Sequence, residues 1–195
     1  MRKTVLIFII FIALGTAMWG FFGQKSSKNT AIPNTIAPLL TGWMKNFTPA
    51  DPVGPAMKLE VLAQNGKILS LNKFRGKLLL INFWATWCTP CILEMPSLVT
   101  LQKKRGGRDF TVLALSQDFQ EWKAIKPFLE KYKLDGIPIY VDSKSAIGIK
   151  LKVIGLPTSV LLSPAGKVLG YLKGVAEWDS PEAIALIDYY RSLRR

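Results

Sequence analysis

The chain holds two cysteines, Cys88 and Cys91, and only two residues separate them, at the end of a long apolar run. Residues 77–85 have the continuous hydrophobicity of a central buried strand, whereas residues 89–104 have a helical pattern. We therefore predict that the cysteine pair lies where a buried strand passes into a helix. Two cysteines in one short window also exclude a framework of several disulfides, so the core must hold the fold together.

Histidine is absent from all 195 residues, and this absence removes several classes of site. No side chain can serve as the base of an ordinary Ser-His-Asp or Cys-His enzyme. A structural zinc site is nearly excluded because it needs about four ligands. A c-type haem site needs His directly after the second cysteine, where this chain has Ile92. A redox pair, a two-thiolate site for a soft ion such as Cu(I), and two inert core cysteines remain open.

The start of a helix suits a reactive thiol, since its free N–H groups and partial positive charge favour the thiolate. Cys88 is then the thiol that attacks a disulfide, and Cys91, one turn into the helix, resolves the mixed disulfide. Glu94 lies three residues after Cys91, near it on the helix surface, and could exchange a proton with it. The alternative for Glu94 is a solvated carboxylate without a role. We expect Trp84 to pack in the core and Trp87 to border the site.

The remaining pattern predicts an α/β fold with a mixed central sheet, helices on both faces and an added N-terminal β-hairpin. The turn Asn65-Gly66 predicts the hairpin, and Ser180-Pro181 predicts the start of the last helix. The expected strands cover residues 58–63, 67–71, 77–85, 109–116, 137–141, 158–163 and 168–173. The expected helices cover residues 89–104, 121–133 and 144–151, followed by the helix that Ser180 opens.

The N-terminal sequence predicts that the rest of the chain is exported from the cytoplasm. Residues 5–22 carry no charge and are long enough to span a bilayer, and Arg2 and Lys3 favour a cytoplasmic N-terminus. We expect a signal-anchor helix at residues 1–22, an extracytoplasmic linker at 23–56 with five of the twelve prolines, and the domain at 57–195. The alternative is a cleaved signal peptide with Gly15-Thr16-Ala17 as the cleavage site.

These features together resemble the membrane-tethered, thioredoxin-like disulfide reductases of bacteria, the TlpA/ResA-type family. The residues that carry the resemblance are Phe74-Arg75-Gly76-Lys77, Asn82 to Cys91, Glu94-Met95-Pro96, Gly155-Leu156-Pro157-Thr158 and Gly174-Val175-Ala176-Glu177-Trp178. The resemblance implies that Cys88 attacks, that Cys91 resolves, and that Glu94 is the family's active-site carboxylate. It also implies a cis bond at Pro157, which would face the cysteines.

The resemblance further implies that the backbone of Leu156 pairs with an extended client segment. Trp87, Thr89 and Pro90 complete the expected client-binding surface. Two departures matter. Asn82 stands where thioredoxin has a buried Asp, so the proton-transfer role of that Asp is not carried over. Thr158 follows the expected cis-proline, where the branch that reduces apocytochrome c usually has Glu, and this favours the TlpA side.

We therefore expect an extracytoplasmic thiol–disulfide oxidoreductase, chiefly a reductase, anchored in the inner membrane with its catalytic domain in the periplasm. The resemblance implies clients of cytochrome c or cytochrome oxidase assembly and a membrane electron donor. We expect a monomer with no metal site and no cofactor besides the redox-active cysteine pair. The alternatives are a dithiol oxidase or isomerase, and a chaperone that binds Cu(I) transiently. Despite a net charge of +13, we expect no nucleic-acid partner, because the basic run at residues 103–108 closes a helix.

Overall fold

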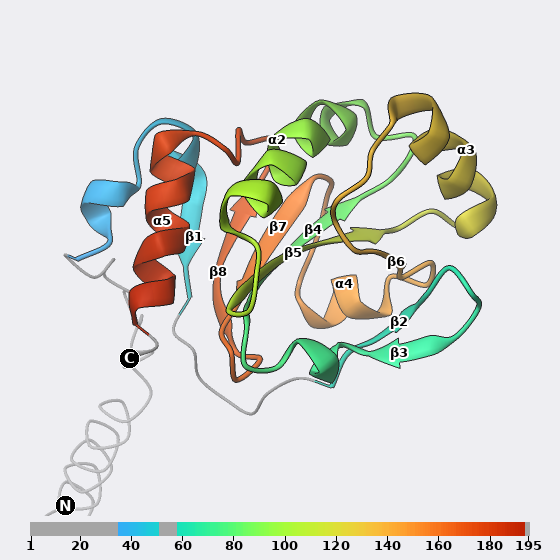
Figure 1. Cartoon of the computed structure of the whole chain (residues 1–195), viewed down its shortest axis with the longest axis horizontal. Coiled ribbons are helices and arrows are strands. Elements are labelled where there is room, and N and C mark those ends of the chain that lie inside the picture. Colours follow the sequence, from blue (N-terminus) through green and yellow to red (C-terminus); the bar gives the residue numbers. More distant parts are fainter. Residues whose placement is uncertain (1–34, 51–57, 194–195) are drawn as a thin grey trace, which may run out of the picture. The chain divides into compact units, whose positions relative to one another are not determined.

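The computed structural model describes residues 35–50 and 58–193 of the chain (Figure 1). These residues lie within one compact unit, Ile32–Arg195. The expected membrane anchor at residues 1–22 lies outside the described residues. Within the described ranges, no helix combines the length and the apolar character that crossing a membrane requires.

The described residues form an eight-stranded mixed sheet in the order β1-β8-β7-β4-β5-β6-β2-β3. Parallel pairs join β4 to β5 and β5 to β6, while the other neighbouring strands pair antiparallel. The strands are β1 (Phe47–Pro49), β2 (Glu60–Leu62), β3 (Ile68–Ser70), β4 (Leu78–Trp84), β5 (Phe110–Ser116), β6 (Ile139–Val141), β7 (Thr158–Leu162) and β8 (Val168–Lys173).

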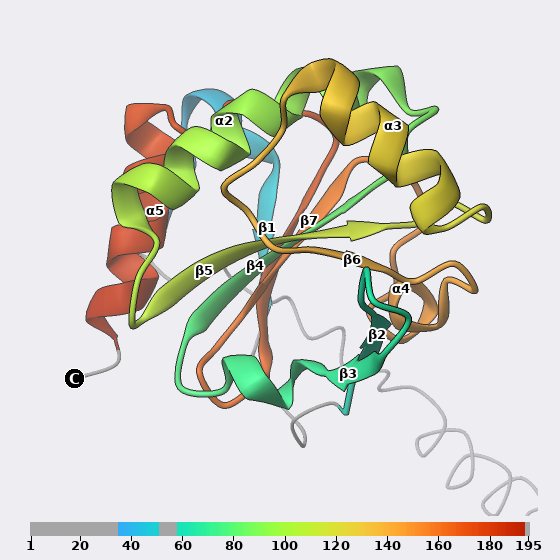
Figure 2. The same ribbon diagram turned by 45° about the vertical axis from the view of Figure 1, so that its right-hand side comes forward.

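Helices cover both faces of this sheet, as the sequence predicts (Figure 2). Residues of α2, α3 and α5 pack in one hydrophobic cluster, and residues of α4 pack in the other, on the opposite face. The helices are α2 (Thr89–Arg105), α3 (Trp122–Tyr132), α4 (Ala146–Lys150) and α5 (Pro181–Ser192), with short 3-10 turns η1 (Ala37–Leu39), η2 (Gly42–Asn46) and η3 (Leu71–Phe74). The predicted cap of the last helix is confirmed, since the Ser180 side chain accepts from the backbone N–H of Ala183.

Strand β4 is the central strand that the apolar run predicts. All seven of its residues are buried, and it lies between the parallel strand β5 and the antiparallel strand β7. Its side chains alternate between the two cores, so that Leu80 and Trp84 face one and Leu79 and Ile81 face the other. This burial holds the end of β4, and with it the residues that lead into Cys88.

The predicted hairpin is also present. Strands β2 and β3 pair antiparallel around the turn that contains Gly66, whose φ of 77° lies in the left-handed region that favours glycine. The pairing of Leu62 with Val141 attaches the hairpin to β6. The hairpin therefore extends the sheet rather than standing apart from it.

The folded domain begins before the expected boundary at residue 57. Ile36, Met44 and Phe47 are buried in the main hydrophobic cluster, and β1 pairs with the edge of β8. Gly170 of β8 leaves room for this strand, since a Cβ there would collide with the ring of Phe47. Residues 35–50 have no regular apolar periodicity. The burial of Ile36, Met44 and Phe47 is therefore seen only in their packing against the rest of the domain. The other residues of the expected linker, 23–34 and 51–56, lie outside the described residues.

Candidate functional site

Cys88 and Cys91 form a disulfide at the start of α2. Cys88 is the N-cap residue of the helix, and Pro90 lies in its first turn, where a missing N–H costs nothing. The exposed fraction is 6% for Cys88 and 1% for Cys91, which is the order of accessibility that the attacking and resolving roles require. After reduction, a thiolate on Cys88 would lie against the free N–H groups of the helix start, which stabilise negative charge.

The loop before β7 carries the expected cis bond, between Leu156 and Pro157. Leu156 packs against the cluster that contains both cysteines. The next residue, Thr158, pairs with Phe83 of β4, five residues before Cys88. The carbonyl of Pro157 accepts from the N–H of Gly174 at 2.9 Å, which ties this loop to the segment after β8. The pairing of Thr158 with Phe83 thus places the cis bond at the end of β4 from which the chain runs on to Cys88.

Glu94 is not on the helix surface, and the solvated alternative is wrong. Its exposed fraction is 1%, and its Oε1 accepts from the indole N–H of Trp178 and from the amide of Asn82, the latter at 3.3 Å. Burial raises the pKa of Glu94 to about 8, the Trp178 hydrogen bond lowers it, and the charge of Glu177 raises it. A carboxyl group with such a pKa can accept or release a proton near neutral pH.

Asn82 connects Glu94 to the strand after the cis-proline. Its Nδ2 donates to the hydroxyl of Ser159 at 3.1 Å as well as to Glu94. Asn82 is itself 1% exposed. The Oδ1 of Asn82 and the Oε2 of Glu94 are buried and accept no hydrogen bond from the described residues. Asn82 and Ser159 are neutral, so Glu94 supplies the ionisable group of this hydrogen-bonded set of three residues.

Trp178 is a site residue that sequence reasoning missed. The motif at residues 174–178 contributes to the family resemblance, but it assigns no role to Trp178. Its backbone N–H donates to the hydroxyl of Ser97 at 3.0 Å, and that hydroxyl donates to the carbonyl of Glu94 at 2.8 Å. Trp178 is fully buried. Its backbone binds Ser97 and its indole binds Glu94, so both contacts fall within one turn of α2. No sequence spacing could indicate a contact between residues 84 positions apart.

Asp118 is a second residue that the sequence did not indicate. It follows β5, is 2% exposed, and accepts hydrogen bonds from the backbone N–H and the hydroxyl of Thr86. The Ser116 hydroxyl donates to the same carboxylate at 2.7 Å. Thr86 lies two residues before Cys88, so Asp118 fixes the loop that leads from β4 to the disulfide.

The surroundings of the disulfide expose apolar side chains. Trp87, next to Cys88, is 67% exposed, and Thr89 and Pro90 at the start of α2 are exposed as well. Phe119 follows Asp118, and Ile154 lies two residues before Leu156; both are more than 80% exposed. The site therefore offers an open apolar surface, which suits a protein segment as the partner of the disulfide.

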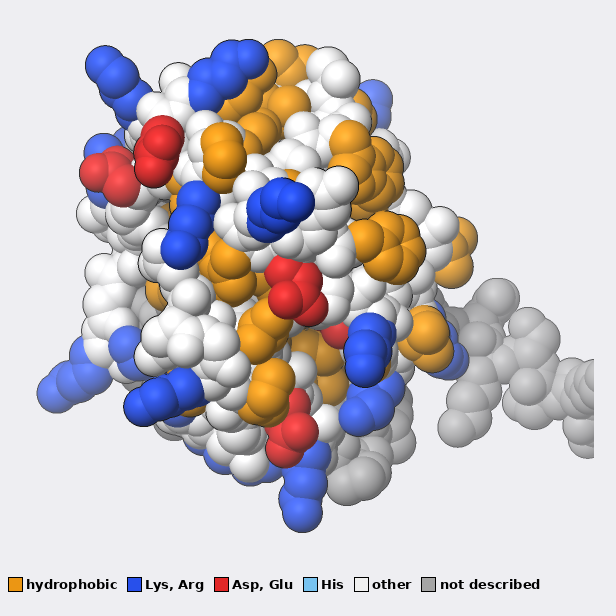
Figure 3. Space-filling view, turned by 90° about the vertical axis from the view of Figure 1, so that its right-hand side faces the viewer, with side chains coloured by type: hydrophobic (Ala, Val, Ile, Leu, Met, Phe, Trp, Pro, Cys, Tyr) orange, Lys and Arg blue, Asp and Glu red, His pale blue; other side chains and the backbone are white. Residues whose placement is uncertain are grey.

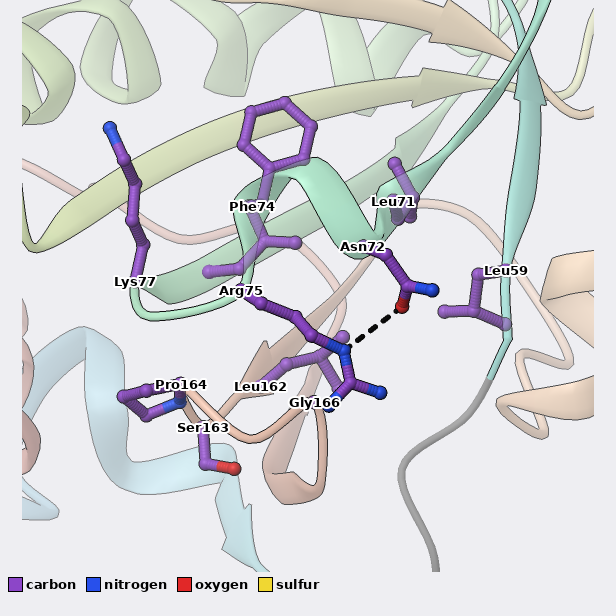
Figure 4. Close-up of a pocket in the computed structure, with 11 residues that line it drawn as sticks. Leu59, Leu71, Asn72, Phe74, Arg75, Lys77, Leu162, Ser163, Pro164 and Gly166 are labelled. Carbon is purple, nitrogen blue, oxygen red and sulfur yellow. Dashed lines mark hydrogen bonds between the residues drawn. The ribbon is translucent and has the colours of Figure 1, made fainter.

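Two hollows of the described residues lie elsewhere. Figure 4 shows one beside the start of β4, where Arg75 donates to the Oδ1 of Asn72. The other lies between the β2–β3 hairpin and the residues of α3 and β6. On the face that Figure 3 shows, basic, acidic and apolar side chains are interspersed. Neither hollow is lined by the cysteines, Glu94, Pro157 or Trp178.

Over residues 35–50 and 58–193, no three or more His, Cys, Asp or Glu side chains lie close enough to hold an ion. The two sulfurs are joined to each other in this structure. The chemistry that the geometry offers is thus exchange of this disulfide with the sulfurs of another molecule.

Comparisons with known proteins agree with this geometry. The model of the AhpC/TSA family matches residues 53–170. The thiol-disulfide oxidoreductase ResA of Bacillus thuringiensis subsp. konkukian (strain 97-27) is 38% identical over 109 residues, 56% of this chain and 62% of the relative. The thioredoxin-like protein YneN of Bacillus subtilis (strain 168) is 35% identical over 116 residues, 58% of this chain and 65% of the relative. In each case the match spans somewhat less than two thirds of the relative.

Among solved structures, a similar one is the thiol:disulfide interchange protein, a thioredoxin family protein, from Chlorobium tepidum TLS. It has a TM-score of 0.59 and 25% sequence identity, and the match covers 74% of this chain and 99% of that chain. The match covers most of both chains, so the fold is thioredoxin-like, as the TlpA/ResA-type resemblance implies.

Proposed function

Because this chain belongs to the AhpC/TSA family, we propose that it is a thiol–disulfide oxidoreductase that reduces disulfides of client proteins outside the cytoplasm. The observation that carries the proposal is the disulfide between Cys88 and Cys91 at the start of a helix, with the cis Leu156–Pro157 bond at the same end of β4. The relatives called thiol-disulfide oxidoreductase ResA support this activity.

The reaction uses the two cysteines in turn. In the reduced protein, the Cys88 thiolate attacks one sulfur of a client disulfide, and the other client sulfur leaves as a thiolate. Cys91 then attacks the sulfur of Cys88, which releases the second client thiol and leaves the Cys88–Cys91 disulfide of this structure. Two electrons pass to the client. Glu94, three residues from Cys91 and buried with it, takes the proton of the Cys91 thiol.

The client lies on the open surface around Cys88. The backbone of Leu156, beside the cis bond, pairs with an extended client segment. Trp87, Thr89 and Pro90 contact that segment from the start of α2. The exposed aromatic ring of Trp87 contributes apolar contact that does not depend on a particular client sequence.

The location and partners follow from the N-terminal sequence and from the family resemblance. The apolar residues 5–22 anchor the chain in the inner membrane and leave the catalytic domain in the periplasm. A membrane thiol–disulfide protein returns electrons to the cysteine pair. Clients are proteins of cytochrome c or cytochrome oxidase assembly, including those with copper-site cysteines, and the protein acts as a monomer.

Trapping a mixed disulfide tests the proposed reaction. The full-length Cys91→Ser variant is mixed with a disulfide-bonded model protein, and the covalent complex is measured by non-reducing electrophoresis. Cys91→Ser should accumulate the complex, because the resolving thiol is gone. Cys88→Ser is the matched control and should accumulate little of it, since Cys91 is more deeply buried. Equal trapping by both variants, or by neither, would contradict the proposed roles.

The reduction potential separates a reductase from its alternatives. A value near or below about −220 mV supports a reductase, whereas a value near about −120 mV indicates an oxidant with an unstable disulfide. If no cysteine pair titrates, the redox function fails. Retention of Cu(I) by the reduced protein against a chelator, lost in Cys88→Ser, would then point to a copper chaperone.

A further inference from the structure

We propose that Trp178 is a positioning residue of the site: its indole N–H holds one oxygen of Glu94, so that proton exchange with Cys91 passes through the other oxygen. The inference rests on the proposed function, because it assigns the proton path of that exchange reaction. Trp178 lies outside residues 53–170, which match the AhpC/TSA family.

The contacts of Glu94 are divided unequally between its two oxygens. Oε1 accepts from the indole of Trp178 and from the amide of Asn82, whereas Oε2 accepts from none of the described residues. A buried oxygen without a donor is costly unless it carries a proton itself or receives one. Oε2 is thus the atom of Glu94 at which a proton can be bound and released without breaking an existing hydrogen bond.

Trp178 is held in place from two directions, which makes it a rigid donor. Its backbone N–H donates to the Ser97 hydroxyl, which in turn donates to the carbonyl of Glu94. The Ser97 hydroxyl also lies 3.4 Å from the carbonyl of Ala176. The indole is fully buried and lies in the same hydrophobic cluster as the cysteines. The backbone hydrogen bond therefore fixes the main chain of Trp178 beside α2, and the surrounding core restrains the indole that donates to Glu94.

The same segment also reaches the client side of the site. Gly174 donates to the carbonyl of Pro157, four residues before Trp178. Asn82 donates both to Glu94 and to Ser159, two residues after Pro157. Two separate connections thus join the loop that faces the client to the carboxyl group behind the cysteines.

Few charged groups act on Glu94, so the hydrogen bond from Trp178 has a measurable effect. Glu177, from the same loop, raises the pKa of Glu94 by its charge. The neighbours Asn82, Ser97 and Ser159 are neutral, and Cys88 and Cys91 titrate only after reduction. The indole N–H stabilises the carboxylate against burial, so its removal should raise the pKa of Glu94.

The experiment compares Trp178→Phe with the unmodified full-length chain, both in the oxidised state. Glutamate side chains are labelled with ¹³C at the carboxyl carbon, and the signal of Glu94 is identified by its absence in Glu94→Gln. Loss of a hydrogen bond to a charged group should raise the titration midpoint of Glu94 by about one to two pH units. The pH profile of mixed-disulfide resolution in the reduced variant should move upward by the same amount.

Trp84→Phe is the matched control, because Trp84 is equally buried and its indole N–H has no hydrogen-bond partner among the described residues. It should leave the midpoint of Glu94 where the unmodified chain has it. A Trp178→Phe midpoint equal to that of the unmodified chain, or matched by Trp84→Phe, would overturn the proposal. So would a pH profile of resolution that does not follow the midpoint.

A second variant covers the case in which Trp178→Phe does not fold. Incorporation of 3-benzothienylalanine at position 178 replaces the indole N–H with sulfur and keeps the shape of the ring system. It should raise the midpoint as Trp178→Phe does, and an unchanged midpoint would again overturn the inference. Because the titration of Glu94 is measured on the oxidised protein, its result does not depend on enzymatic activity. Absence of any exchange reaction in the unmodified chain would instead contradict the proposed function.

Discussion

The indole N–H of Trp178 donates a hydrogen bond to the Oε1 of Glu94 across 84 residues of sequence, within the core that also holds the cysteine pair. Glu94, whose pKa burial raises to about 8, is thus a buried carboxyl group in the helix that begins at the disulfide. The stability of the oxidised protein should report on this buried group without any client present.

We predict that the free energy of unfolding falls as the pH rises from about 4.5 to about 8 because of Glu94. Its pKa in the folded state is raised above the unfolded value, so the folded protein holds a proton that the unfolded chain has released. At about 1.4 kcal/mol per pH unit, this contribution is on the order of 5 kcal/mol. Urea unfolding of the oxidised protein at several pH values measures it. Glu94→Gln should lose this pH dependence, and an equal slope in both proteins would refute the prediction.

We predict that Asn82→Asp destabilises the protein, and that the effect grows with pH. The new carboxyl group would lie at hydrogen-bond distance from Glu94, and two such groups cannot both ionise cheaply when buried. The expected loss is about 2 to 5 kcal/mol at pH 9, measured by chemical unfolding. Asn72→Asp is the control, since Asn72 is exposed and accepts from Arg75. The idea fails if the two variants lose the same stability at pH 9.

We predict that Thr86→Val costs about 1 to 3 kcal/mol of stability, because it removes a donor from the buried carboxylate of Asp118. Thermal or urea unfolding measures the change. Thr100→Val is the matched control, since the Thr100 hydroxyl donates to Pro96 at the surface, where water can replace it. A Thr86→Val variant as stable as Thr100→Val would show that the Asp118 contact does not hold the loop before Cys88.

We predict that Phe47→Ala destabilises the catalytic domain by about 3 to 5 kcal/mol, although residue 47 lies in the segment expected to be a linker. Phe47 is 3% exposed, and its ring packs against Tyr190 of α5 and over Gly170. Thr48→Ala, on the exposed side of the same strand, should cost far less. Equal unfolding midpoints for the two variants would mean that β1 adds nothing to the domain.

Local sequence features determined much of the fold. The apolar run at 77–85 predicted the central strand, and the turn around Gly66 and the cap Ser180 predicted the hairpin and the last helix. The position of Cys88 at the end of that strand predicted a cysteine pair at a helix start, and the structure joins the pair as a disulfide. Each of these depends on neighbouring residues, because hydrogen bonds within a turn and the alternation of a strand are short-range.

Only the tertiary structure decided which side chains surround the site. Three-residue spacing placed Glu94 near Cys91, but it could not distinguish the solvent side of α2 from the side that Trp178 covers. The contact of Asp118 with Thr86 and the burial of Phe47 depend likewise on strands that meet across the sheet. The energy of a buried carboxyl group depends on its distance from water and on its hydrogen-bond donors. Those are set by packing between segments far apart in the sequence, which no local pattern records.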